Sequence, residues 1–412
     1  MADAALTVER WARRLRAASL GFALIAAAFG GTALTLRIGA AGSMLAITDS
    51  FEFIAQINAT AHAVVFGWLG LWAMAAAWRT LPRTWAVDLP GAGWCAPIAL
   101  LAIGGIGLRS VVQLVDPRGV GLAALGSALE TVALLLFALQ ILALRARRTR
   151  RVAAVDALAP LALAFTVAAA IADAWHAWRI GTAVDLVGLV AAVKVSQPPL
   201  RDLQLHGMAL SWVLMLAWTT GGAQPNRRAV VIAAWLLALA VVGEVGLYLA
   251  YRVSGDHVWA MALPLAWLLI GGAFLIFVAR RRWWSATPVP PGLRAAFAWF
   301  AIALALRLLF RPYHVALGAP FSHAYFAALG QAAAVGFVAQ ALIALDDAAT
   351  GRRSPAVLIA LNLGCALHIA GMIGTDWHPA WKTPLIVAGL IEGAAIAAWV
   401  VARAAVRRRS AG

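Results

Sequence analysis

The chain has 412 residues, of which 63% are hydrophobic and 12% are charged, and its formal net charge is +16. A soluble protein of this length carries about twice that share of charged residues, so the composition excludes an ordinary soluble domain. Apolar runs of membrane length fill the sequence, which predicts an all-α, polytopic integral membrane protein surrounded by the lipid bilayer. The positive charge does not indicate a nucleic-acid partner, because the Arg residues lie in short segments between apolar runs.

We expect twelve spanning helices in a single membrane domain, residues 1–412. Arginine clusters at 145–151, 280–282 and 407–409 follow the fourth, eighth and twelfth helices, and they divide the chain into three repeats. We expect the three four-helix units, 1–151, 152–293 and 294–412, to adopt a parallel pseudo-threefold arrangement. The predicted spans are 17–39, 60–78, 93–115, 119–144, 152–174, 205–221, 229–251, 259–280, 294–312, 323–345, 355–376 and 383–404.

The distribution of arginine predicts the topology. The Arg-rich connections and both termini fall on the same side of the predicted helices, which places both termini in the cytoplasm. We interpret the first apolar run as a retained helix, because it is too long for the apolar region of a signal peptide. Two long outer loops, 40–59 and 182–204, are expected to form short helices on the outer surface.

One apolar run that opens on a histidine occurs three times along the chain. The copies begin at His62, His206 and His323, and each is followed by sequence that contains arginine. The first two copies also follow a membrane-length run that ends in Arg-Ile-Gly, at 37–39 and 179–181. This repeat places an imidazole at the outer end of the second helix of each unit.

All eight histidines fall on the outer side of the predicted topology or just below it. Imidazole is the commonest protein ligand for haem iron and a good ligand for copper, so this grouping indicates a metal or haem site. The alternative, a histidine that caps a helix at the interface, is preferred for the outer-loop residues His176, His257 and His378. The candidate ligands are His62, His206 and His323, with His314 and His368 in support.

Ionisable residues also lie inside the predicted spans, where they are costly unless they face the bundle interior and find partners. The third helices carry Arg109, Glu244 and His368 in turn. Structural Arg–Glu pairing is the interpretation preferred for Glu130, Glu392 and Arg307. A sharper alternative assigns Arg109 and Arg311 to an anionic group such as a haem propionate.

At these residues the chain resembles the NnrS family of twelve-helix bacterial membrane proteins. The second helix of that family opens with a His-Ala-His-Glu-Met-Leu-Phe-Gly type of motif, and residues 60–67 here read Thr-Ala-His-Ala-Val-Val-Phe-Gly. Thr60 and Ala63 depart from the motif, while His206 and His323 open later helices as the family's histidines do. The resemblance implies a bacterial inner (plasma) membrane protein that binds haem and copper, with a role in nitric oxide metabolism or nitrosative stress.

A fainter similarity is to subunit I of the haem–copper oxidases. It implies that His62 and His323 pair on a haem while His206 serves a separate site. The paired histidines of the oxidase copper site and its Gly-His-Pro-Glu sequence are missing here, so oxygen or nitric oxide reduction at a binuclear centre is not supported.

The leading hypothesis is therefore an NnrS-like haem- and copper-binding membrane protein, with His62, His206, His323 and His368 as metal ligands. Two alternatives stay open. In a cofactor-free transporter or channel, Arg109, Glu130, Glu244 and His368 would line a path. In a degenerate scaffold, the fold would remain after the site has been lost.

Overall fold

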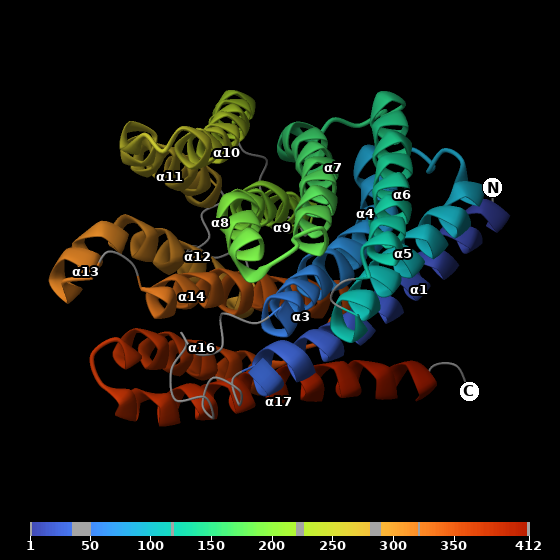
Figure 1. The fold of residues 1–412 in the computed structure, drawn as a ribbon. Coiled ribbons are helices and arrows are strands. Elements are labelled where there is room, and N and C mark those ends of the chain that lie inside the picture. The colour runs from blue at the N-terminus through green and yellow to red at the C-terminus, as the bar shows by residue number, and fades with distance from the viewer. Residues whose placement is uncertain are drawn as a thin grey trace. The chain divides into compact units, whose positions relative to one another are not determined.

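The computed structural model describes residues 2–34, 51–116, 119–219, 226–280, 290–319 and 322–409 (Figure 1). Within these ranges the chain is helical, with no β-strand. Four of the helical elements are π-helical, with backbone hydrogen bonds that reach one residue further than in an α-helix. The prediction of an all-α protein is confirmed.

Helical elements follow one another throughout the described ranges. In order they are α1 (Ala2–Ala26), η1 (Ala27–Leu34), α3 (Phe51–His62), η2 (Ala63–Gly70), α4 (Leu71–Trp85), η3 (Ala92–Trp94), α5 (Cys95–Val115), α6 (Val120–Ala146), α7 (Ala153–Gly181), α8 (Leu186–Asp202), η4 (Leu203–Ala209), α9 (Leu210–Thr219), α10 (Arg227–Ser254), α11 (His257–Arg280), α12 (Pro291–Leu308), α13 (Phe310–Leu317), α14 (His323–Gln331), η5 (Ala332–Ala339), α15 (Gln340–Thr350), α16 (Pro355–Thr375), η6 (Pro379–Trp381) and α17 (Lys382–Arg409).

Among the described residues, ten helices are long and apolar enough to cross a membrane. Their existence follows from local sequence, because each contains about 18 or more consecutive residues of predominantly apolar type. They are Ala55–Trp85, Ala92–Val115, Val120–Ala146, Ala153–Gly181, Arg227–Ser254, His257–Ala279, Pro291–Leu308, His323–Thr350, Pro355–Thr375 and Pro379–Ala405. The chain is thus compatible with a multi-pass membrane protein.

Two of the predicted spans are not among these ten. The first, 17–39, extends beyond residue 34 and so lies partly outside the described ranges. The second, 205–221, is helical up to Thr219, but it follows directly on Asp202 and contains His206. These polar groups lower the mean hydropathy of a helix that is otherwise apolar.

Within the described residues, eight of the ten helices expose large apolar side chains, whereas Ala55–Trp85 and His323–Thr350 are mostly buried. Leu100, Leu139 and Trp235 are 61%, 62% and 74% exposed, and many other leucines and valines lie beside them along the same helices. A water-soluble protein rarely exposes apolar surface of this extent. Lipid is the solvent that suits these faces, because helices satisfy their own backbone hydrogen bonds there.

The two long outer connections were expected to form short helices, and the parts of both that the structure describes are helical. Residues 35–50 lie outside the described ranges, but α3 starts at Phe51 and runs without a break into η2 and α4. Likewise α8 runs directly into η4 and α9, although it contains Pro198 and Pro199. Both prolines are buried, Asp185 caps the start of α8 by accepting from Gly188 N, and the helix persists through the two prolines.

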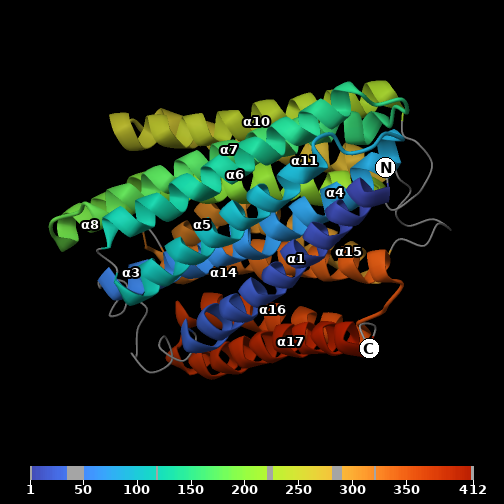
Figure 2. The same ribbon diagram turned by 90° about the vertical axis from the view of Figure 1, so that its right-hand side faces the viewer.

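The chain divides into two compact units. Unit 1 comprises Met1–Ser19 and Val65–Thr287, and unit 2 comprises Leu20–Val64 and Pro288–Gly412. Within unit 1, α5 packs against α6 and α10 against α11, while α7 contacts α8, η4, α9 and α10. Within unit 2, α16 and α17 lie side by side, and α12 packs on η5 and α15 (Figure 2). Each pair of neighbours in sequence, α5–α6, α10–α11 and α16–α17, forms a helical hairpin.

Small residues allow α5 and α6 of unit 1 to pack closely. A Cβ atom on Gly105 would lie 2.6 Å from Glu130 N and 2.7 Å from Gly126 O, and one on Gly126 would lie 2.8 Å from Arg109 N. Such contact of two backbones is typical of small-residue interfaces in membranes. It also places Arg109 and Glu130, each one turn beyond a glycine, at the same helix interface.

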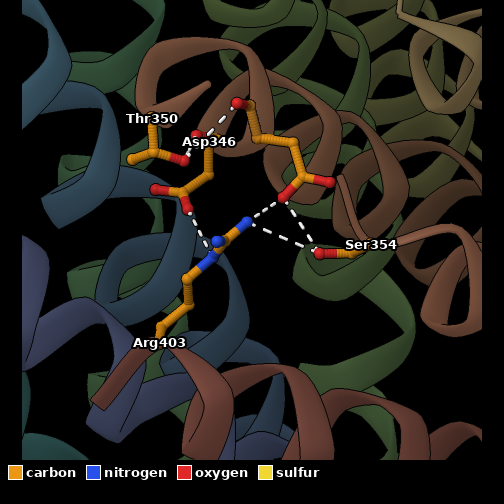
Figure 3. A network of polar contacts seen from close by, with 5 residues as sticks. Asp346, Thr350, Ser354 and Arg403 are labelled. Carbon is orange, nitrogen blue, oxygen red and sulfur yellow. Dashed lines mark hydrogen bonds and ion pairs between the residues drawn. The ribbon is translucent and has the colours of Figure 1, made fainter. Parts of the chain in front are cut away.

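A buried ionic network ties α15 to α17 in unit 2 (Figure 3). Arg403 Nε lies 3.0 Å from Asp346 Oδ2, while Arg403 Nη2 pairs with Asp347 Oδ1. Ser354 Oγ donates to Asp347 Oδ1 over 3.1 Å and Thr350 Oγ1 donates to Asp346 O over 2.8 Å. One guanidinium therefore compensates two adjacent carboxylates at the C-terminal end of a helix, where negative charge is unfavourable.

Candidate metal centre

The three histidines that open the repeated apolar run occupy three different local settings. His62 is the last residue of α3 and is 1% exposed, and His206 lies inside η4 and is 4% exposed. His323 is the first residue of α14 and is exposed. His206 belongs to unit 1, whereas His62 and His323 belong to unit 2.

The three helices that carry these histidines also contain π-helical segments. Aligning the helices on their π segments gives a different match from aligning them on their histidines. The π segments begin at Ala63, Leu203 and Ala332, so the residues immediately before them are His62, Asp202 and Gln331. His206 lies one turn after Asp202, and His323 lies two turns before Gln331. Aligning the sequence on its histidines therefore misses two polar residues, Asp202 and Gln331, that hold the matching structural position. π-Helical segments occur frequently at functional sites.

Asp202, His206 and Glu244 form a buried group in unit 1. Each offers one ligand atom, these atoms lie within 4.8 Å of one another, and the three residues are 1%, 4% and 0% exposed. Asp202 ends α8, His206 follows one turn later, and Glu244 reaches the group from α10, which packs against α8. The described residues contain this one group of three or more His, Cys, Asp or Glu side chains whose ligand atoms are close enough together to hold a metal ion.

Hydrogen bonds fix the orientation of the imidazole and of the carboxylate. His206 Nδ1 lies 2.8 Å from Glu244 Oε2, and Trp267 Nε1 on α11 donates to Glu244 Oε1 over 2.7 Å. In the tautomer with hydrogen on Nδ1, His206 donates to Glu244 and offers Nε2 to a metal; in the other tautomer, Nδ1 and Glu244 Oε2 face the same ion. A carboxylate behind a ligating histidine is the usual arrangement around protein-bound metals.

The charges around the group favour a cation. Two carboxylates, Asp202 and Glu244, lie in a helical interior where an ionised group needs a partner. The guanidinium of the half-buried Arg201 lies 3.9 Å from Asp202 Oδ1, at the outer limit of an ion pair. Imidazole and carboxylate together suit zinc, iron, manganese and copper(II). The donor set is therefore suitable for copper, one of the two cofactors that the NnrS resemblance implies.

The same donor set fits a bare ion better than a haem. The axial residues of haem iron are His, Cys, Met or Tyr, not paired carboxylates. Around His206 the carboxylates of Asp202 and Glu244 lie within ligand distance, which suits an ion coordinated directly by side chains. A haem ligand would have to come from the other predicted residues, His62 or His323.

His368 forms a second imidazole–carboxylate pair, in unit 2. Its Nδ1 lies 2.9 Å from Glu392 Oε2, and both residues are buried, at 4% and 1% exposed. The prediction that Glu392 pairs with an arginine is wrong, because its partners are His368 and Gln331. Sequence pattern identified the buried ionisable groups but not which helices face one another.

The predicted anion-binding arginines lie in contrasting surroundings. Arg109 is 1% exposed and its Nη1 pairs with Asp173 Oδ2 on α7, within unit 1. This carboxylate already balances the guanidinium, as a propionate would. Arg311 is exposed and lines an open cavity of about 360 Å³ together with His314.

His314 has both ring nitrogens engaged by the protein. Nδ1 donates to Phe310 O over 2.6 Å, and Nε2 accepts from Ser322 N over 2.7 Å. Beside it, burial raises the pKa of Tyr313, whose hydroxyl donates to Asp376 Oδ2 over 2.7 Å. A metal could bind His314 only by displacing one of these hydrogen bonds, so the residue fits a structural role at the start of α14.

No protein-family model and no curated protein matches this chain. The resemblance to NnrS therefore stays an expectation from the motif residues.

Proposed function

We propose that this chain is a multi-pass membrane protein that holds a transition-metal ion at Asp202, His206 and Glu244. One observation carries the proposal: three ligand atoms of suitable chemistry lie within 4.8 Å of one another, and all three residues are buried. Intramembrane ionisable residues are expensive and usually functional. Trp267 and the His206–Glu244 hydrogen bond hold the ligands in place before the ion arrives.

At most three protein ligands are available in this group, which leaves a coordination position for a small molecule. Structural metal sites are usually closed by four protein ligands, whereas sites that act on a ligand keep one position for it. An ion held by one imidazole and up to two carboxylates is of the second kind. A diatomic ligand such as nitric oxide would bind there, which agrees with the NnrS-like role in nitric oxide metabolism or nitrosative stress that we propose for the chain.

Metal analysis of the purified protein tests the proposal. Full-length protein in detergent is expected to retain about one equivalent of transition metal per chain at this site. We expect His206→Ala to remove that equivalent, and Glu244→Gln to weaken binding by about 10–100-fold if Glu244 acts through His206. His257→Ala is the matched control, because His257 is exposed in the same unit. Equal metal content in His206→Ala and His257→Ala would refute the proposal.

The haem part of the proposal has a separate readout. If a haem is bound through His62 and His323, as the fainter oxidase resemblance implies, the purified protein shows a Soret band. His62→Ala and His323→Ala each remove or shift that band, whereas His206→Ala leaves it unchanged. Protein from haem-replete cells with no Soret band would reject haem and leave the metal site standing.

We also propose the finer architecture of twelve helices in three parallel four-helix units, with both termini in the cytoplasm of a bacterial inner membrane. Support comes from the π-helical segments, which recur in the second predicted helix of each four-helix repeat, at η2, η4 and η5. The hairpins α5–α6, α10–α11 and α16–α17 are likewise the third and fourth helices of each four-helix repeat. Reporter fusions that are active only in the cytoplasm, placed after residue 412 and within 145–151, test the topology.

A transporter is the second candidate, and the buried ionisable groups favour it. Glu244, Arg109 and His368 are all 4% exposed or less, as residues that line an ion path inside a membrane are. This candidate predicts flux into liposomes that falls in Glu244→Gln while metal content stays near zero. The scaffold alternative predicts instead that His62→Ala, His206→Ala and His323→Ala combined leave the cellular phenotype unchanged.

A further inference from the structure

Unit 2 contains a polar group that the proposed centre does not use. Gln331 from α14, His368 from α16 and Glu392 from α17 meet in the interior, and these helices pack against one another within the unit. Gln331 Nε2 lies 2.6 Å from Glu392 Oε2 and 3.2 Å from His368 Nδ1, and the latter two atoms are 2.9 Å apart. Three side-chain atoms thus lie as close together as the ligands of one ion.

The π-helical register makes Gln331 the counterpart of Asp202. Each is the residue immediately before the π segment of its helix, at η5 and η4 respectively. Each contributes to a group that also holds one histidine and one glutamate. In unit 2 a neutral amide replaces the carboxylate of unit 1, and the histidine and the glutamate come from α16 and α17 rather than from η4 and α10.

The Glu392 carboxylate has one oxygen that the described part of the chain leaves unsatisfied. Oε2 takes both hydrogen bonds, while Oε1 is buried and has no partner among the described residues. Glu392 is 1% exposed, so water does not compensate this oxygen readily. A buried acceptor without a donor is unfavourable, and a cation is the kind of group that satisfies it.

The surroundings fix this carboxylate in place. A Cβ atom on Gly364 would lie 2.7 Å from Glu392 Cγ, so α16 has no side chain where Glu392 packs. Cys365 follows that glycine and is buried one turn before His368, with its Sγ 3.8 Å from Gln331 O. The group is therefore held by three helices rather than by a loop, as a preorganised ligand set requires.

We propose that Gln331, His368 and Glu392 form a second metal-ion site, separate from the Asp202–His206–Glu244 centre and weaker than it. The ligand is a divalent transition-metal ion, because imidazole selects zinc, copper, iron or nickel over magnesium or calcium. Gln331 turns its amide so that Oε1 faces the ion, an orientation that exchanges two nearly isosteric atoms. His368 binds as the neutral ring, and the hydrogen on Nδ1 moves to Nε2 if Nδ1 is the ligand. Replacing a carboxylate by an amide removes one negative charge, which lowers affinity.

Titration of the full-length protein with Co²⁺ in detergent, followed by its visible absorption and by competition with Zn²⁺, tests this inference. His206→Ala isolates the second site and is expected to keep one weak equivalent, which His368→Ala added to it removes. Gln331→Glu is expected to tighten this equivalent by at least about tenfold. Misfolding would weaken Co²⁺ binding rather than tighten it, so a gain in affinity in Gln331→Glu reports on the site itself. His378→Ala is the control, because His378 is exposed in the same unit.

The outcomes separate the two sites. If His206→Ala binds no Co²⁺ and Gln331→Glu does not restore binding, the second site is rejected while the first stands. If the wild-type protein binds one equivalent that survives His206→Ala and disappears in His368→Ala, the first site is rejected and the second stands. If binding in His206→Ala is the same with and without His368→Ala, the ion lies elsewhere and the inference is overturned.

Discussion

Removing the guanidinium of Arg403 is expected to destabilise unit 2 strongly. Arg403, Asp346 and Asp347 have side chains that are 7%, 2% and 8% exposed, so the network is shielded from water (Figure 3). Loss of one partner from a buried ion pair costs about 3–5 kcal/mol, because the remaining charge is left uncompensated. Here two carboxylates remain, and both lie at the C-terminal end of α15, where the helix dipole disfavours them.

The expected effect is a large fall in melting temperature for Arg403→Met, on the order of 10 °C for a unit of this size. Arg403→Lys is expected to recover only part of the loss. The arginine uses Nε for Asp346 and Nη2 for Asp347, and a lysine ammonium does not reproduce that fork. A thiol-reactive or tryptophan fluorescence melt of the protein in detergent measures the change.

Two comparisons decide whether the charge imbalance is the cause. Arg353→Met removes the same charge from an exposed position beyond α15, and it should change the melting temperature little. Combining Arg403→Met with Asp346→Asn and Asp347→Asn should recover most of the stability, since no uncompensated charge remains. Equal stability of Arg403→Met and Arg353→Met would refute the reasoning.

Three further predictions concern unit 1. Asp173→Asn leaves the buried Arg109 without its carboxylate and should cost about 3–5 kcal/mol, whereas Asp173→Leu with Arg109→Leu should cost much less in the same melting assay. Gly105→Leu should separate α5 from α6, because even a Cβ would lie 2.6 Å from a backbone nitrogen, and lower the yield of monodisperse protein in size-exclusion chromatography. The hydrogen bond from Arg79 lowers the pKa of Glu9 below 4.5. The pair therefore stabilises the fold above about pH 4.5, and this stabilisation is lost as the pH falls through the folded-state pKa. Glu9→Gln should flatten that part of the profile of stability against pH.

Much of the fold follows from local sequence. A run of about 20 apolar residues has one stable solution in a bilayer, because the helix is the element that satisfies its own backbone. Ten of the predicted spans correspond to such helices. The boundaries were less predictable at α8, because the predicted span begins at 205 whereas one continuous helix runs from Leu186 through Pro198, Pro199 and Asp202. Tertiary packing buries those residues, and packing is not a local property of the sequence.

The candidate site was only partly predictable. His206, Glu244, His368 and Glu392 were recognisable as rare polar groups in apolar helices, and the structure buries all four. The pairing of these four residues could not be predicted, because sequence periodicity does not show which helix faces which. Asp202 was missed altogether, although its position one turn before His206 is a spacing that places both side chains on one face of a helix.

The register of the repeat explains why the histidine alignment misled. A π-helical segment holds its backbone with hydrogen bonds one residue longer than those of an α-helix, so the side chains beyond it turn to a different face. His62 precedes its π segment and His206 lies within one, and the same residue type therefore serves two different geometries. Only the structure shows that Asp202 and Gln331 are the matched positions.

The two buried imidazole–carboxylate pairs are difficult to explain as stabilising features. A buried ion pair or its hydrogen-bonded equivalent is often no more stable than apolar side chains of the same volume, because desolvation offsets the attraction. His206–Glu244 and His368–Glu392 are both nearly inaccessible to solvent, and each sits among apolar helices where leucine or phenylalanine would pack. Each compact unit holds one such pair close to the residue that precedes a π segment, Asp202 in one and Gln331 in the other, which is a pattern that a ligand explains and that packing alone does not.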